Sequence, residues 1–187
     1  SRVVACRAAA LLLASLEGVD PGSPPVLSKV RSSDLVDSLP AEVSAAAVAS
    51  QLGVDPERMV KLTATEFDAD VVLPIRSVAA HVLSEARRVD DAEAALEAND
   101  YHELGRLLDA SHESLRDFGA SSQALDRLVG AMREAGAYGA RLTGAGFGGY
   151  AIGICPLDRI DALIEAADQA TGGPAFRVRP SAGVSGV

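Results

Sequence analysis

Apolar residues recur at helical spacing through most of the first 135 residues of the chain. Recurrence every three to four positions is typical of helices that bury one side, and glycine or proline closes most of these segments. Asp55-Pro56-Glu57 predicts one more helix start inside the less regular stretch 54–70. The other helices are expected over residues 2–16, 33–39, 41–52, 73–98, 101–115 and 123–135.

The pattern changes after residue 136. Short apolar runs over 140–143 and 150–155 flank a glycine-rich stretch and predict two strands. A helix that starts between Pro156 and Asp158 and runs through Ala170 follows, and then a last strand over 175–178. The whole pattern predicts an α+β fold, in which several helices pack with a small antiparallel sheet.

The expected core positions lie on one side of each long helix. They are Val78, Val82, Ala86, Val89 and Leu96 in 73–98, Leu104, Leu107, Leu108 and Leu115 in 101–115, and Leu125, Leu128, Val129 and Met132 in 123–135. Ser122 precedes the third of these helices and is expected to cap it.

The amino-acid composition argues against some classes of binding partner. The 187 residues carry 26 acidic and 17 basic side chains, a net charge of −9. That balance opposes binding to nucleic acid or to an anionic membrane surface, and no apolar run approaches the roughly 20 residues that would span a bilayer. Two cysteines, Cys6 and Cys155, form no disulfide framework or metal-ligand pattern, which favours a reducing cytoplasm.

Four glycines fall between Gly144 and Gly149. The spacing Gly-x-Gly-x-x-Gly formally matches a dinucleotide-binding fingerprint, but that motif requires a helix directly after it, and here a strand is predicted. The run also lacks the Gly-Lys-Ser/Thr ending of a phosphate-binding P-loop. Two interpretations remain: exposed backbone amides that line a phosphate, with Arg141 and Thr143 nearby, or a tight hairpin turn without a ligand. The density of glycines favours the phosphate site.

A second polar cluster, 111–117, lies at the end of a predicted helix. His112 within it could act as a general base, but no cysteine or metal-type partner accompanies it. A histidine near a helix end more often contacts the last carbonyl groups, and we favour that role. His81 and His102 are interpreted as ordinary surface or half-buried residues, and the pair Arg87-Arg88 as part of a solvated helix face.

These two segments, Ser-His-Glu-Ser-Leu-Arg-Asp over 111–117 and Gly-Ala-Arg-Leu-Thr-Gly-Ala-Gly-Phe-Gly-Gly over 139–149, resemble the C-terminal part of galactokinases. Galactokinases are members of the GHMP family of small-molecule kinases. The intervening helix at 125–129, the stretch 177–183 and the spacing Arg2-x-x-x-Cys6 are similar to the same family. The resemblance covers essentially the whole chain, so residues 1–187 are expected to form a GHMP-kinase C-terminal-type domain.

The resemblance implies the C-terminal part of an enzyme that transfers the γ-phosphoryl group of ATP to a sugar hydroxyl, converting galactose to galactose 1-phosphate. ATP and Mg²⁺ are the implied cofactors, and the cytoplasm is the expected location. The family's catalytic aspartate, magnesium ligands and Ser-rich nucleotide loop are expected in an N-terminal half that this chain lacks, so no catalytic or metal-ligating residue is assigned and no activity is expected of this chain alone. Its partners would be the sugar, the nucleotide and that N-terminal half. The implied nucleotide-binding residues are Arg141, Thr143, Gly144, Ala145, Gly146, Phe147, Gly148 and Gly149.

The chain departs from the family in two places. Phe118-Gly119-Ala120 stands where an acidic–tyrosine–acidic stretch is usual, and Tyr150 stands where a cysteine or small residue is frequent. Together with 124–129, the first departure is similar to mevalonate-type kinases. The alternatives are therefore another GHMP kinase, of the arabinose, sugar-acid or mevalonate type, or a non-catalytic module that keeps the fold for sugar sensing or partner binding.

Overall fold

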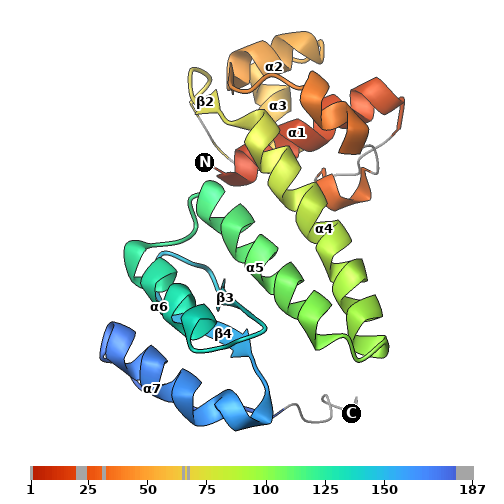
Figure 1. The fold of residues 1–187 in the computed structure, drawn as a ribbon. Helices are drawn as coiled ribbons and strands as arrows, with labels where there is room; N and C mark the ends of the chain where they lie inside the picture. The colour runs from red at the N-terminus through yellow and green to blue at the C-terminus, as the bar shows by residue number, and fades with distance from the viewer. Residues whose placement is uncertain (1, 20–24, 31–32, 65, 67, 180–187) are drawn as a thin grey trace, which may run out of the picture. The chain divides into compact units, whose positions relative to one another are not determined.

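The computed structural model describes residues 2–19, 25–30, 33–64, 66 and 68–179, and the chain forms two compact units that divide between Asp90 and Asp91 (Figure 1). The long helix α4, Ile75–Glu97, runs across that division. The α+β expectation is confirmed, with helices and two small antiparallel sheets in the described part of the chain. No helix among these residues is long and apolar enough to cross a membrane.

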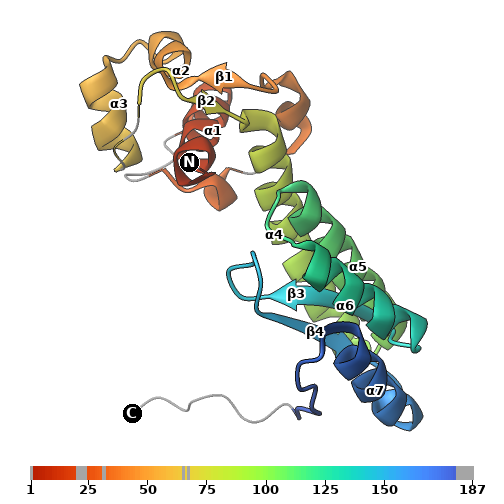
Figure 2. The same ribbon diagram turned by 90° about the vertical axis from the view of Figure 1, so that its left-hand side faces the viewer.

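The first unit is built around helix α1, Arg2–Glu17, which packs against α2, α3 and β2 (Figure 2). Its other elements before α4 are η1 (Leu27–Lys29), η2 (Ser33–Ser38), β1 (Val43–Ser44), α2 (Ala45–Gln51), α3 (Pro56–Thr63) and β2 (Val72–Leu73). Helix α1 is buried almost all round, as a helix without a polar face must be. Its buried residues are Val4, Ala5, Ala8, Ala9, Ala10, Leu12, Leu13 and Ala14.

Side-chain caps explain where two of these helices begin. The Asp55 carboxylate accepts the backbone N–H of Arg58 at 2.7 Å, which confirms the helix start predicted there. Ser44 caps α2 by accepting the N–H of Ala47. The helix expected over 41–52 is therefore shorter than predicted, because Val43 and Ser44 pair with β2 as a strand before the cap.

The second unit contains a hairpin covered by helices. Its elements after α4 are α5 (Tyr101–Asp117), α6 (Gln123–Glu134), β3 (Gly139–Thr143), β4 (Tyr150–Ile154), η3 (Leu157–Arg159) and α7 (Ile160–Thr171). The strands pair in antiparallel register from Gly139↔Ile154 to Thr143↔Tyr150. Helix α5 packs along β3, and α6 and α7 lie side by side (Figures 1 and 2). Ser122 caps α6 as predicted, by accepting the N–H of Leu125.

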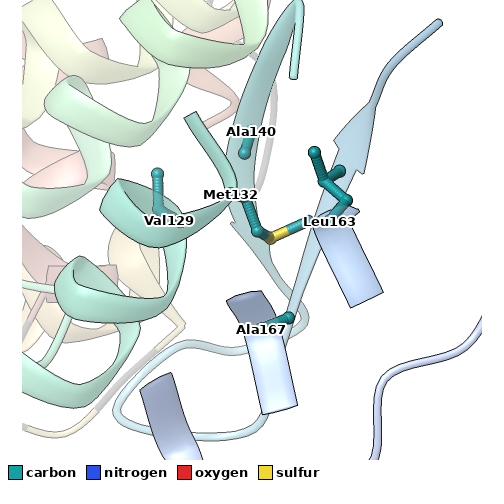
Figure 3. Packing of buried hydrophobic residues seen from close by; sticks show 5 residues of the cluster. All are labelled: Val129, Met132, Ala140, Leu163 and Ala167. Carbon is teal, nitrogen blue, oxygen red and sulfur yellow. The ribbon is translucent and has the colours of Figure 1, made fainter. Parts of the chain in front are cut away.

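A small apolar cluster joins α6, α7 and the hairpin. Figure 3 shows Met132 and Leu163 pointing toward one another beside Ala140. The buried members are Val129, Met132, Ala140, Leu163 and Ala167. The predicted core positions Leu125, Val129 and Met132 are buried, so the periodicity of this helix located its inner side correctly.

Two glycines allow α5 to approach β3 at backbone contact. A Cβ on Gly105 would lie 2.1 Å from the carbonyl oxygen of Tyr138, and one on Gly139 would lie 1.9 Å from the carbonyl oxygen of Gly105. No real Cβ fits at such distances, so the helix could not lie this close to the strand with any other residue at either position.

Two expectations are wrong. The strand predicted over 175–178 is absent, because the N–H of Ala175 bonds to the side chain of Asp168 at 2.6 Å and Phe176 and Val178 are 68% and 70% exposed. On α4, Val78 is buried as expected, but Val89 and Leu96 are 67% and 54% exposed. Positions 180–183 of the family-like stretch lie outside the described residues.

Candidate functional site

The glycine run is the loop that joins β3 to β4, as the flanking strands predicted. Five of its residues have positive φ: Gly144 (85°), Gly146 (79°), Phe147 (62°), Gly148 (142°) and Gly149 (99°). This backbone is left-handed almost throughout, a conformation that side-chain-bearing residues rarely adopt. Phe147 adopts it despite its bulky side chain, which is 67% exposed. The surroundings must therefore hold the loop in place.

The loop is held against the turn between α5 and α6. The N–H of Phe147 donates to the carbonyl oxygen of Ala120 at 2.8 Å. A Cβ on Gly146 would lie 2.2 Å from that same oxygen, so only glycine fits there. By contrast, a Cβ on Gly144, Gly148 or Gly149 would meet no atom within 4 Å. The loop is thus fixed on one side and open on the other.

Arg141 and Thr143 lie on β3 immediately before the loop. Both are half-buried and alternate with the buried Ala140 and Leu142, so they share the hairpin face that turns away from the core. The Nε of Arg141 donates to the carbonyl oxygen of Leu142 at 2.9 Å. The structure therefore brings these two predicted residues to the base of the glycine loop.

His112 has a different role from the one predicted. It is 2% exposed and does not contact the last carbonyls of its own helix. Its Nδ1 accepts the N–H of Leu142 on β3 at 3.3 Å, and its Nε2 lies 3.2 Å from Oδ1 of Asp126 on α6. The same Asp126 oxygen accepts the hydroxyl of Ser121 at 2.6 Å. The prediction is wrong because a buried helix face turns the imidazole toward the strand rather than toward the helix end.

The pKa of His112 lies below its ordinary value, chiefly because burial disfavours the charged imidazolium. Asp126 opposes this shift, while the positive charges of Arg133 and Arg116 add to it. A neutral imidazole also suits the geometry, since an Nδ1 that accepts a hydrogen bond carries no proton.

Asp109 holds the other end of β3, and sequence reasoning missed it. Its Oδ1 accepts the N–H of Ala140 at 2.9 Å and the Nε of Arg133 at 2.6 Å. Asp109 and His112 are three residues apart and therefore share one side of α5, while Ala140 and Leu142 are two apart and share one edge of β3. That matched spacing was visible in the sequence, but its meaning depended on knowing that α5 lies against β3.

Among the described residues, no group of three or more histidine, cysteine, aspartate or glutamate side chains could hold a metal ion. What this unit offers a ligand is a loop of exposed backbone, bordered by Arg141 and Thr143. Exposed backbone of this kind suits an anion, because its amides can supply hydrogen-bond donors.

Residues 92–173 match the family model of the GHMP kinases C terminal domain. The match runs from the end of α4 through α7 and contains the glycine loop, His112 and Asp126. This part of the chain is therefore similar to the C-terminal domain of the GHMP kinases. The extension of that domain over all of 1–187 stays a prediction.

Two curated proteins that the chain resembles are galactokinases. The galactokinase of Mycobacterium tuberculosis (strain ATCC 25618 / H37Rv) is 44% identical over 115 residues, which cover 59% of this chain and 31% of the relative. The galactokinase of Roseiflexus sp. (strain RS-1) is 43% identical over 122 residues, which cover 61% of this chain and 31% of the relative. The chain thus spans about a third of the length of the curated relatives that it matches.

A solved structure agrees with this relationship. The crystal structure of Lactococcus lactis galactokinase complexed with galactose matches with a TM-score of 0.55 at 25% identity, over 89% of this chain and 37% of the other. The α+β fold expected from the sequence is that of a galactokinase C-terminal part.

Proposed function

We propose that this chain is the C-terminal part of a galactokinase-like enzyme that transfers the γ-phosphoryl group of ATP to a sugar hydroxyl. The 44% identity to a galactokinase over 115 residues, together with the family match at 92–173 that contains the glycine loop, is the observation that carries the proposal. The loop geometry supports it, since a left-handed run with an open side is suited to an anionic group.

In this proposal the residues of this chain bind and orient the phosphates of ATP and take no part in bond making or breaking. Bound ATP would supply the phosphoryl group, and transfer of that group depends mainly on positioning and on stabilisation of charge. The backbone of Gly144, Ala145, Gly146, Phe147, Gly148 and Gly149 would form a floor beside the phosphates. Arg141 would add positive charge at the base of the loop, and Thr143 a hydroxyl.

The proposed reaction also uses Mg²⁺. We assign its ligands, and the base that activates the sugar hydroxyl, to the portion of the longer kinase that precedes this chain. Mg²⁺ and that base are therefore not assigned to any residue here.

The test is a coupled assay of ADP release with galactose, made on this chain alone and on the longer kinase that the proposal implies. The longer protein should turn over galactose, and the isolated chain should show no turnover above background. Turnover by the isolated chain, or none by the longer protein with any sugar, would refute the proposal.

In the longer protein, Gly146→Ala should lower kcat/KM about 100-fold, because the added Cβ would push the loop away from Ala120. Gly130→Ala, which adds a methyl group in open space on α6, is the matched control.

The particular sugar is proposed on the relatives alone. Tyr150, which stands where the family often has a cysteine or a small residue, is 71% exposed directly across from Thr143. A substrate panel of galactose, arabinose, a sugar acid and mevalonate, run on the longer protein, separates the GHMP kinases. Preference for galactose supports the proposal, and preference for another of these would replace the substrate while keeping the kinase.

A further inference from the structure

His112 connects the two segments that hold the glycine loop. On one side its Nδ1 accepts the N–H of Leu142, two residues before the loop begins. On the other side its Nε2 lies 3.2 Å from Asp126, which also accepts the hydroxyl of Ser121 at 2.6 Å. Ser121 follows Ala120, whose carbonyl oxygen receives the N–H of Phe147 within the loop. A continuous path of hydrogen bonds and short backbone segments therefore connects Leu142, just before the loop, to Phe147 within it.

We infer that His112 is a positioning residue for the glycine loop: as a neutral imidazole bonded to both Leu142 and Asp126, it sets where the loop lies relative to the α5–α6 turn. This inference rests on the proposed function for what the loop binds. It assigns to the buried histidine neither the role of a general base nor that of a helix cap.

The two contacts assign the tautomer. The backbone N–H of Leu142 can only donate, so Nδ1 must accept and carry no proton. The proton of the neutral ring therefore sits on Nε2, where it is donated to the Asp126 carboxylate. A carboxylate opposite Nε2 stabilises this tautomer and fixes the ring orientation.

Protonation would break this arrangement, because an Nδ1–H would point at the N–H of Leu142. The charged groups that face the ring are Asp126 and Arg133 from α6 and Arg116 from α5. Burial is the largest influence and lowers the pKa of His112; Arg133 and Arg116 lower it further, while Asp126 raises it without reversing the shift. The neutral state needed for positioning is thus the one that the surroundings maintain near neutral pH.

Amide hydrogen exchange on the full 187-residue chain tests the inference without any ligand. Ala140 and Leu142 are two residues apart on β3 and both donate to α5, but Ala140 donates to Asp109 rather than to His112. His112→Ala should accelerate exchange at Leu142 and Phe147 by about tenfold relative to Ala140. Equal acceleration at all three amides would indicate only a loss of packing and would overturn the inference, as would no change at any of them.

Two conservative variants separate the two hydrogen bonds. In His112→Asn the side-chain oxygen lies near the position of Nδ1, so protection of the Leu142 amide should be restored to within about threefold of the native value. In His112→Gln the amide reaches toward Asp126 instead, and the Leu142 amide should stay unprotected. His102→Asn, the same change on the exposed part of α5, is the matched control and should leave exchange at Leu142 unchanged. Restoration by glutamine and not by asparagine would contradict the assigned tautomer.

Kinetics of the longer kinase provide a separate readout. His112→Ala should raise KM for ATP about tenfold and leave KM for the sugar within about twofold, since only the loop is displaced. An unchanged KM for ATP in an active kinase would overturn the inference. If the native kinase is inactive, the proposed function fails, and the exchange experiment still decides whether His112 positions the loop.

Discussion

The helices α1 and α5 are each the centre of a unit, but they are held by opposite kinds of contact. Helix α1 has eight buried residues, and all of them are alanine, valine or leucine. The buried residues of α5 are Gly105, Leu107, Ser111 and His112. Helix α5 meets its strand through glycine contacts and through Asp109 and His112. Helix α1 packs mainly through apolar surface, although Arg7 also donates a hydrogen bond to the carbonyl oxygen of Thr63 on α3.

This difference shows that one interface mainly supplies stability, whereas the other mainly sets the position of a strand. Apolar contacts stabilise in proportion to buried area and have no direction, so α1 supplies stability without specifying much beyond its buried side. The two hydrogen bonds from β3 to α5 are directional. A slip of one residue would turn the N–H groups of Ala140 and Leu142 away from their acceptors and move the glycine loop with them. The second interface therefore sets geometry, and it lies next to the candidate site.

The largest expected effect is in the apolar interface. Leu13 is fully buried in α1, and Leu13→Ala should lower the free energy of unfolding by about 4 kcal/mol through the cavity it leaves. Chemical denaturation measures the change. Ser15→Ala, at an exposed position near the end of the same helix, should alter it by no more than about 0.5 kcal/mol. Similar losses in both variants would mean that the buried side of α1 is not what stabilises this unit.

The close contact between Gly105 on α5 and the backbone of Tyr138 should be nearly as important for stability, but here the damaging change is an added methyl group rather than a cavity. Gly105→Ala places a methyl group against the backbone of Tyr138 and should cost about 3 kcal/mol of unfolding free energy. Gly130→Ala on α6 makes the same chemical change in open space and should stabilise by about 0.5–1 kcal/mol, because alanine is the better helix former. Comparison of the two denaturation midpoints gives the result, and a tolerated Gly105→Ala would contradict the close helix–strand approach.

Removal of Asp109 should have a smaller effect. Asp109→Ala takes away the acceptor of the Ala140 N–H and the partner of Arg133, at a cost of about 2 kcal/mol of unfolding free energy. Asp109→Asn keeps an acceptor oxygen and should recover about half of that loss. Asp117→Ala, an exposed residue at the end of the same helix, serves as control. Equal stability of the alanine and asparagine variants would show that the strand N–H does not depend on this side chain.

The smallest expected effect is a dependence on pH. The pKa of His112 is lowered in the folded chain, so the unfolded chain binds the proton more readily, and stability is complete above the ordinary histidine pKa of about 6.5. Stability should fall as the pH drops below that value toward the lowered pKa of the folded state. Denaturation at pH 7.5 and pH 5.5 measures the loss, with His112→Asn as the variant in which this component should vanish. An identical pH response in that variant would assign the loss to other groups.

The sequence predicted most of the fold because its helices bury one side and its caps are local. Periodicity located the inner side of α6, and Ser122 and Asp55 marked two helix starts. The same periodicity gave a wrong prediction for Val89 and Leu96 on α4, which are exposed although they keep the apolar spacing. The strand predicted over 175–178 was also wrong, since an apolar run becomes a strand only when another strand is there to share its hydrogen bonds.

The candidate site divides in the same way. A run of glycines between two apolar segments, together with the resemblance of 111–117 and 139–149 to galactokinases, located the loop and its family from the sequence alone. The sequence determined this because the need for left-handed backbone is written locally as glycine. What holds the loop was decided only by the tertiary structure, through the pairing of Asp109 and His112 with Ala140 and Leu142 and the contact of Phe147 with Ala120. These partners lie 27 to 31 residues apart along the chain, and no local pattern records that a helix face and a strand edge will meet.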